Sequence, residues 1–184
     1  MATSHVDPHQ RSQDTRRRIL EMAVSLREDR TGGSVDHFLA LLQDRLPLWL
    51  SILHDLSHNV GKGCVSDNLL PIAAAGIDYY MEVQGAALPA FTSPNVTVRF
   101  REAIRDTGLG PRTETAPLAA YLAAEQQLGR VGPDVDPEAS ARLLIAGCFH
   151  RAYIEMFVGP DAAPTLEDSA LEIVRELRLA PVPA

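Results

Sequence analysis

The 184-residue sequence predicts an all-α protein of about eight helices, on three observations. Apolar residues recur at spacings of three and four, which is the period of a helix that buries one face. Glycine and proline gather between the periodic segments, where they end one helix and begin the next. No segment alternates apolar and polar residues for long enough to form a strand. Residues 96–100 come nearest, but they follow a Ser-Pro pair that favours a helix.

The first predicted helix begins at Asp14 or Thr15, because a side-chain oxygen at either position can accept an unpaired backbone N–H. The Gly32-Gly33 pair ends that helix. Residues 1–13 are polar and are predicted to form a disordered tail.

The second predicted helix begins after a capping Ser34, and its apolar residues form one stripe. Pro47 lies inside this pattern and lacks a backbone N–H, so we expect a kink or two abutting helices there. The stripe consists of Phe38, Leu41, Leu42, Leu46, Trp49, Ile52, Leu53 and Leu56.

The third predicted helix covers residues 68–88, follows a loop at 58–68 and has Asp67 as its expected cap. Ser93 and Pro94 start the fourth helix, since proline is favoured at the first helical position. Three more helices are predicted over residues 113–130, 137–158 and 166–179, with Gly129 closing the first of these. The expected starts of the last two are Asp136 with Pro137, and Thr165 paired with Asp168.

Composition and charge restrict the classes of function. With 46% apolar residues the chain can bury a core, yet no apolar run reaches the roughly 18 residues of a membrane-spanning helix. Residues 1–10 lack the pattern of a secretory signal, and Cys64 and Cys148 are too few for a disulfide framework, so we expect a cytoplasmic protein. Residues 1–30 carry six arginines against five acidic residues, whereas the rest of the chain sums to −8. An acidic body repels nucleic acid, so any DNA contact has to come from the N-terminal arm.

Two short patterns were considered as catalytic or metal sites. His54 and His58 lie one helical turn apart, the spacing of two ligands on a metal-binding helix, with Asp55 where a hydrolytic zinc helix has Glu. Only Cys64 or Asp67 is at hand as a third ligand, so a helix end with two polar histidines is the simpler interpretation. A small helical metal-dependent enzyme built on His54 and His58 is the alternative function.

The stretch GKGCVS at residues 61–66 lacks the spacing of a phosphate-binding loop. No Ser–His–Asp or Cys–His arrangement follows from spacing either. The sequence therefore predicts no catalytic residues, no cofactor and no enzymatic activity.

The predicted helix at residues 137–158 is apolar over more than half its circumference, which is wider than the stripe of a surface helix. We expect it to be covered on one side by its own domain and on the other by a second copy of the chain; the alternative is a central helix of a monomeric bundle. The predicted interface residues are Leu144, Ile145, Cys148, Ala152, Met156, Val174 and Leu177.

Residues 119–159 (AAYLAAEQQLGRVGPDVDPEASARLLIAGCFHRAYIEMFVG) combine a helix ending in Gly-Arg, an Asp-Pro that starts the next helix, and a helix of small and apolar residues. This combination resembles the C-terminal region of tetracycline-repressor (TetR) family regulators. Residues 15–29 (TRRRILEMAVSLRED) resemble the first helix of that family's DNA-reading head. The resemblance implies an all-helical homodimer, in which the last two helices of each subunit form a four-helix bundle. It also implies a small-molecule pocket that is coupled to the two reading heads.

The sequence departs from the family after the first helix. The family pattern has a second helix, a turn and a recognition helix at this point, whereas this chain has only residues 31–33 before its second helix starts. Residues 14–33 are therefore interpreted as the remnant of a reading head, and residues 34–184 as a ligand-binding and dimerisation domain. Residues 56–70 superficially resemble a helix–turn–helix but carry a single lysine.

These expectations define a function. A TetR-type regulator, or a truncated relative, would bind a small apolar effector, dimerise with itself or with an intact relative, and bind DNA weakly or not at all. Arg16, Arg17 and Arg18 (with Arg11) would contact only DNA phosphates, which orient a protein without specifying sequence. The predicted effector-binding residues are Trp49, Leu53, His54, Tyr79, Met81, Gln84, Leu88 and Tyr121.

Overall fold

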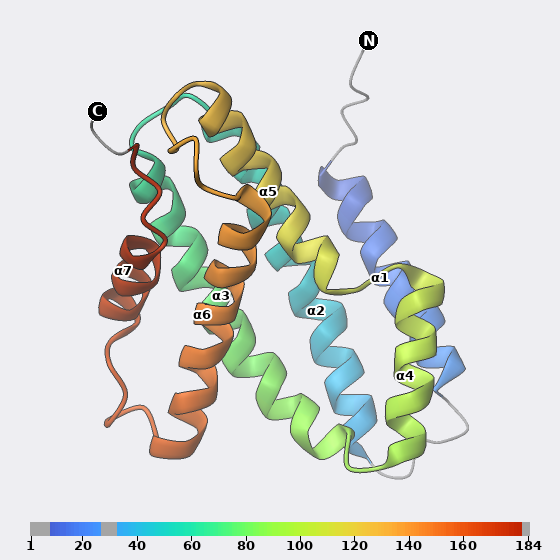
Figure 1. Ribbon diagram of the computed structural model, residues 1–184. Helices are drawn as coiled ribbons and strands as arrows, with labels where there is room; N and C mark the ends of the chain where they lie inside the picture. Colours follow the sequence, from blue (N-terminus) through green and yellow to red (C-terminus); the bar gives the residue numbers. More distant parts are fainter. Residues whose placement is uncertain (1–7, 27–32, 182–184) are drawn as a thin grey trace.

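The computed structural model describes residues 8–26 and 33–181, and within these ranges the fold is all-helical, without a strand (Figure 1). The prediction of an all-α protein is confirmed, with seven α-helices in the described ranges instead of about eight. The elements are α1 (Pro8–Ser25), α2 (Gly33–Asp55), the 3-10 helix η2 (Leu56–Asn59), α3 (Val65–Ala90), α4 (Pro94–Thr107), α5 (Pro111–Gln127), α6 (Pro137–Val158) and α7 (Leu166–Glu176).

The helix count is lower because α2 continues through Pro47. Proline removes one backbone hydrogen bond, but Leu46 and Trp49 on either side of it are both buried in the core. Packing of these side chains holds the two halves of α2 together, so the expected division into two helices does not occur.

The start of the chain also differs from the prediction. Helix α1 begins at Pro8, so residues 8–13 of the predicted tail are helical; the rest of that tail lies outside the described residues. Proline is tolerated there because the first-turn N–H groups of a helix have no partner. Ser34 is inside α2, which begins at Gly33, and therefore does not cap it. Of the Gly32-Gly33 pair predicted to end the first helix, Gly33 is the first residue of α2 and Gly32 lies outside the described residues.

The predicted helix caps Asp136 and Thr165 are confirmed, whereas Asp67 is wrong, as are Asp14 or Thr15 inside α1 and Ser34 inside α2. The Asp136 side chain accepts hydrogen bonds from the backbone N–H groups of Glu138 and Ala139, at 2.9 and 3.2 Å. Thr165 Oγ1 accepts one from Asp168 N at 3.1 Å. Asp67, in contrast, lies in the first turn of α3, because that helix already begins at Val65.

Helix α3 is the central element of the bundle. It packs against α2 on one side and against α6 and α7 on the other, while α1 and α4 lie together at the far end of the molecule from α7 (Figure 1). Glycine permits the closest approaches: a Cβ at Gly76 would lie 3.1 Å from Trp49 and from Cys148, and one at Gly147 only 2.9 Å from Ile173. Among the described helices, none combines the length and apolarity needed to cross a membrane.

Candidate functional site

A cleft of about 1120 Å³ lies between α1, α2 and α5. This volume is slightly larger than the roughly 300–1,000 Å³ of sites that hold small organic molecules. Helix α1 supplies polar side chains to the cleft, whereas α2 and α5 supply mostly apolar ones. The cleft therefore has two chemically different walls.

The apolar wall has its origin in the spacing of small residues on α5. Ala116, Ala120 and Ala124 recur every fourth position and so lie on one face of the helix, where they line the cleft. Leu50 and Leu53 of α2 form the opposite side. Because alanine fills little space, the two helices leave room between them where leucines on both would close the gap.

The polar wall carries three guanidinium groups and one carboxylate. Arg11 and Arg18 come from α1 and Arg112 from the start of α5, and Asp14 is the one acidic side chain that lines the cleft. Asp14 forms an ion pair with Arg17 and lies 3.8 Å from Arg18 Nε. Positive charge is therefore in excess at this site, in a chain whose net charge is −7.

Three of the predicted effector-binding residues line the cleft: Leu53, His54 and Tyr121. His54 Nδ1 lies 2.6 Å from the carbonyl oxygen of Leu50, which can only accept, so Nδ1 carries the proton of this hydrogen bond. The Tyr121 hydroxyl accepts a hydrogen bond from Asn68 Nδ2 at 3.0 Å, and burial raises the pKa of Tyr121 to about 12. Tyr121 thus presents a neutral ring to the cleft.

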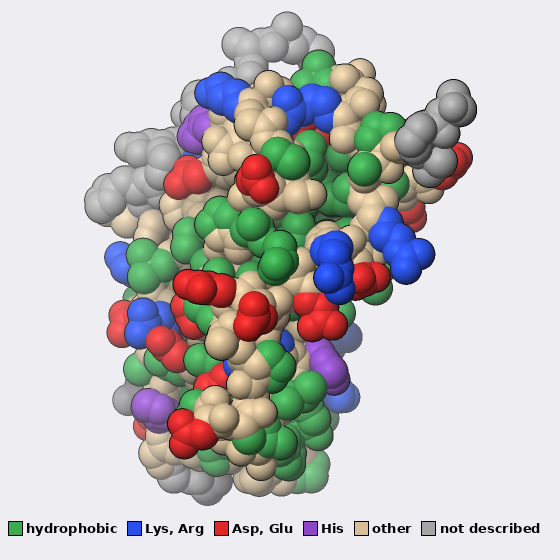
Figure 2. Space-filling view, turned by 90° about the vertical axis from the view of Figure 1, so that its left-hand side faces the viewer, with side chains coloured by type: hydrophobic (Ala, Val, Ile, Leu, Met, Phe, Trp, Pro, Cys, Tyr) green, Lys and Arg blue, Asp and Glu red, His purple; other side chains and the backbone are tan. Residues whose placement is uncertain are grey.

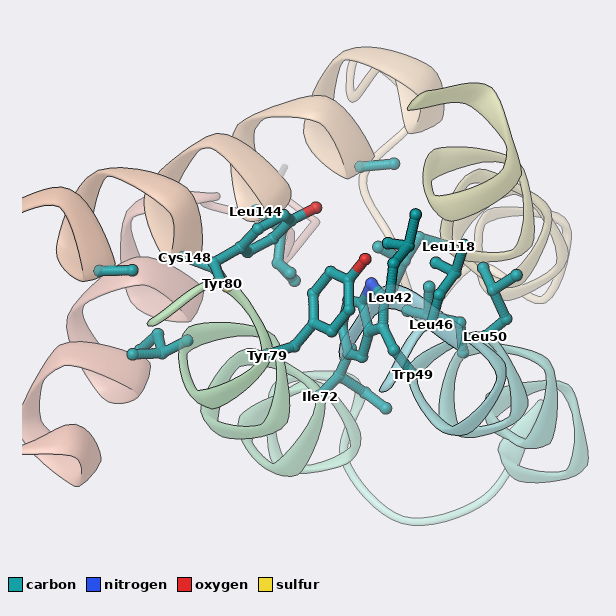
Figure 3. Close-up of a cluster of buried hydrophobic side chains, with 14 of the residues drawn as sticks. Leu42, Leu46, Trp49, Leu50, Ile72, Tyr79, Tyr80, Leu118, Leu144 and Cys148 are labelled. Atoms are coloured by element: carbon teal, nitrogen blue, oxygen red, sulfur yellow. The ribbon is translucent and has the colours of Figure 1, made fainter. Parts of the chain in front are cut away.

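The other five predicted effector-binding residues do not line the cleft. Trp49 and Tyr79 stack at 5.7 Å in the buried cluster of Figure 3 and border a depression of about 210 Å³ instead. Met81 packs against the core, and Leu88 is 56% exposed near the end of α3. Gln84 Nε2 donates a hydrogen bond to the Phe149 carbonyl oxygen at 3.0 Å and so ties α3 to α6.

A buried polar cluster joins three helices beside these aromatic residues. Trp49 Nε1 donates to a carboxylate oxygen of Glu114 at 2.9 Å, and the Tyr80 hydroxyl donates to the same oxygen. Burial raises the pKa of Glu114 above its usual value, and the two hydrogen bonds oppose that rise. Nothing in the sequence distinguishes Glu114 from an exposed acidic residue in the first turn of a helix, so sequence reasoning missed it.

Glu125 and Arg130 form a second polar cluster that sequence reasoning did not single out. Glu125 is fully buried, with Arg130 Nε 2.7 Å from one carboxylate oxygen and the Gly61 N–H donating to the other. Arg130 also donates to the carbonyl oxygens of Lys62 and Gly63. The Gly-Lys-Gly loop is therefore a structural anchor for the end of α5.

The two histidines considered as metal ligands lie on different elements. His54 is on α2 and lines the cleft, whereas His58 is in η2 with Nδ1 4.0 Å from Asp55. Over residues 8–26 and 33–181, no group of three or more His, Cys, Asp and Glu side chains is arranged to hold a metal ion.

Four of the predicted interface residues fill the chain's own core, which corrects their assignment to a dimer interface. Leu144, Cys148, Ala152 and Val174 are almost fully buried, and Figure 3 shows Leu144 and Cys148 beside Tyr80 in the buried cluster. Burial raises the pKa of the Cys148 thiol to about 12. Ile145 and Leu177 are half-buried against the same core, and Met156 is partly exposed. One face of α6 is thus covered by α3, α5 and α7 of the same chain, while large apolar side chains on the rest of its surface are exposed.

The structure also places the segments considered for DNA binding. Arg16 and Arg17 are exposed on α1, while Arg18 turns toward the cleft. Residues 56–70 lead into the central helix α3, whose Leu69 is fully buried, so that helix is enclosed by the bundle. Comparisons with protein-family models, with curated proteins and with solved structures find no match to this chain.

Proposed function

We propose that the chain is a ligand-binding regulator of the TetR type with an incomplete DNA-reading head, and that it binds a small molecule in the cleft between α1, α2 and α5. The observation that carries this proposal is the position of α1. This helix carries the resemblance to a reading head, and it also forms one wall of the cleft. A ligand held between α1 and α5 would restrain α1, which is the coupling that a ligand-responsive regulator needs.

The surface of α1 supports the proposal of an incomplete head. Its buried face, with Ile19 and Met22, packs against α2 and α4. Leu20 and Val24 on another face are 52% and 70% exposed. Apolar side chains on a second face of a helix are typical of a helix that packs against further helices. In the proposed relatives, those would be the second and third helices of the head.

A dimer is part of the proposed function, through the two helices predicted to form it but, apart from Met156, through other residues of them. Helix α6 ends at the lower end of the molecule in Figure 1, and Figure 2 shows hydrophobic side chains gathered at that end. Contiguous exposed apolar groups of this kind are typical of protein–protein interfaces. A second copy, or an intact relative, would cover them. The exposed apolar residues of α6 and α7 are Leu143, Phe149, Tyr153, Met156, Phe157, Val158 and Leu171.

The proposed protein binds DNA weakly or not at all, and it works in the cytoplasm. Arg16 and Arg17 are the exposed arginines of α1, and Arg17 is paired with Asp14. The acidic body adds repulsion, so anisotropy titrations should find salt-sensitive binding with little preference among duplexes. Nanomolar binding to one duplex at physiological salt would contradict an incomplete head.

The proposed cleft can be tested by filling it. Ala120→Phe puts a ring into the cleft from an exposed position on α5, so the core is left intact. Ala162→Phe makes the same change in the exposed loop after α6 and serves as the matched control. In a thermal-shift screen of small apolar compounds, the wild type and Ala162→Phe should gain melting temperature with the same compounds, and Ala120→Phe should not. Equal gains by all three proteins would rule out the cleft as the binding site.

A further inference from the structure

The charge of the cleft indicates which ligands it can hold. Arg11, Arg18 and Arg112 line it, and Asp14 is the one carboxylate among the lining residues. Asp14 is already shared between Arg17 and Arg18. The guanidinium groups of Arg11 and Arg112 form no hydrogen bond or ion pair with any residue in the ranges 8–26 and 33–181.

Arg11 is the decisive residue, because part of its charged group is removed from solvent. Its Nε is buried and has no hydrogen-bond partner among the described residues. A buried donor without a partner costs free energy, and the cost is greater for a charged group. Because Arg11 also lines the cleft, an anion bound there would lie beside this charged group.

The apolar wall of the cleft indicates the chemistry of the remaining part of the ligand. Leu50, Leu53 and the alanines of α5 present an apolar surface opposite the arginines. A fully polar ion would leave this surface in contact with water, and a fully apolar ligand would leave the guanidinium groups without partners. Only a molecule with an anionic head and an apolar body satisfies both walls.

We propose that the cleft binds amphipathic organic anions, with the carboxylate between the guanidinium groups of Arg11, Arg18 and Arg112 and the apolar part against α2 and α5. This proposal rests on the proposed ligand-binding function of the same cleft. Planar guanidinium groups pair with carboxylates through two parallel hydrogen bonds, which makes them suited to such a head group. Because Arg11 and Arg18 are on α1 and Arg112 is on α5, the bound anion would tie these two helices together.

The test compares three probes of equal chain length by isothermal titration calorimetry, each below its critical micelle concentration. Decanoate carries the anionic head, decanol a neutral one and decylamine a cationic one. The wild type should bind decanoate at least about tenfold more tightly than decanol, and decylamine least tightly. Arg11→Gln and Arg112→Gln should each weaken decanoate binding severalfold and leave decanol binding unchanged.

Arg105→Gln is the matched control, since Arg105 is an exposed arginine of α4 that does not line the cleft. It should bind decanoate as the wild type does. Equal loss of affinity in all three variants would indicate a general charge effect and would overturn the proposal.

Two other outcomes separate this proposal from the proposed function. If decanoate and decanol bind equally well and Ala120→Phe abolishes both, the cleft is a ligand site but not an anion site. If Ala120→Phe leaves binding of all probes unchanged, the ligands bind elsewhere, and both the anion proposal and the proposed function of the cleft are wrong. Absence of decanoate binding at millimolar concentration overturns the anion proposal alone.

Discussion

Each end of the bundle has an arginine with little exposure, and the two arginines differ in the partners of their guanidinium groups. Arg151, between α6 and α7, donates from Nε to Ser169 Oγ at 2.9 Å and from Nη2 to the Pro164 carbonyl oxygen, and its Nη1 lies 2.8 Å from Glu155. Arg11, at the cleft, has a buried Nε without a partner among the described residues. A guanidinium group whose donors have partners holds two helices in place, whereas one with an unpaired donor can still bind a ligand.

The two ends of the bundle also differ in how tightly their side chains pack. Gly76 and Gly147 let Trp49, Cys148 and Ile173 approach closely, so the region of α3, α6 and α7 is tightly filled. Between α1, α2 and α5 the chain leaves about 1120 Å³ open. The C-terminal side of the bundle is therefore tightly filled, while the N-terminal side leaves space for the proposed ligand.

The largest expected effect is that of a charge placed in the filled region. Ala152→Glu buries an unpaired carboxylate against the core and should lower the free energy of unfolding by about 3–5 kcal/mol. Phe157→Glu, on the exposed end of the same helix, should convert the proposed dimer to a monomer and lower the free energy of unfolding only by the contribution of the dimer. Urea denaturation and light scattering measure the two effects. A wild type that is monomeric at micromolar concentration would contradict the dimer.

The second prediction compares the two arginines directly. Arg151→Met leaves Ser169, Glu155 and a carbonyl oxygen without their partner and should cost about 3 kcal/mol. Arg11→Met removes a group without a described partner and should change stability by about 0.5 kcal/mol or less. The measurement is urea denaturation of both variants in the same buffer. Similar losses in both would show that Arg11 is structurally paired.

The third prediction uses the buried carboxyl group of Glu114. Burial raises its pKa in the folded protein, so the folded state holds the proton more tightly than the unfolded state does. This contribution to stability is complete below the unfolded pKa, near 4.5, and is lost as the pH rises through the folded-state pKa. Glu114→Gln still accepts the hydrogen bonds from Trp49 and Tyr80 and should be more stable than the wild type at pH 7.

The difference should disappear below pH 4.5, where Glu114 is protonated in both states. Melting curves of the wild type and Glu114→Gln across this pH range test the prediction. A wild type that gains stability relative to the variant as the pH rises would mean that the pKa of Glu114 is lowered, not raised.

The smallest expected effect concerns the exposed face of α1. The double variant Leu20→Ser/Val24→Ser should change the free energy of unfolding by about 0.5 kcal/mol or less, because both side chains are exposed. Ile19→Ala, on the buried face of the same helix, should cost about 2 kcal/mol or more. Chemical denaturation of the two variants provides the comparison, and a large loss in the serine variant would show that this face is covered in solution.

The sequence predicted the helices well where local chemistry determines them. Asp136 and Thr165 cap their helices as predicted, because a cap depends only on neighbouring backbone groups. At Ser34 the prediction was wrong, and of the two outcomes expected at Pro47 the division into two helices does not occur, since tertiary burial of α2 outweighs the local preference of single residues. For the helix at 137–158, cover of one side by its own domain is confirmed, whereas cover of the other side by a second copy stays a prediction, because periodicity does not say which chain supplies the covering helices.

The candidate site was predicted only in part. Leu53, His54 and Tyr121 were among the expected effector-binding residues and do line the cleft. Arg11 and Arg112 were missed as cleft residues, because they are about a hundred positions apart in sequence and only the tertiary fold brings them to the same cleft. Helix periodicity gives the face of each residue, but not which helix that face meets.

The most direct test of the account is hydrogen exchange of the protein with and without saturating decanoate. Because the anion would lie between α1 and α5, amide protection should rise over α1 and the first turns of α5 and stay unchanged in α6 and α7. Protection that rises in α6 or α7 while α1 stays the same would contradict the claim that the cleft beside α1 is the ligand site.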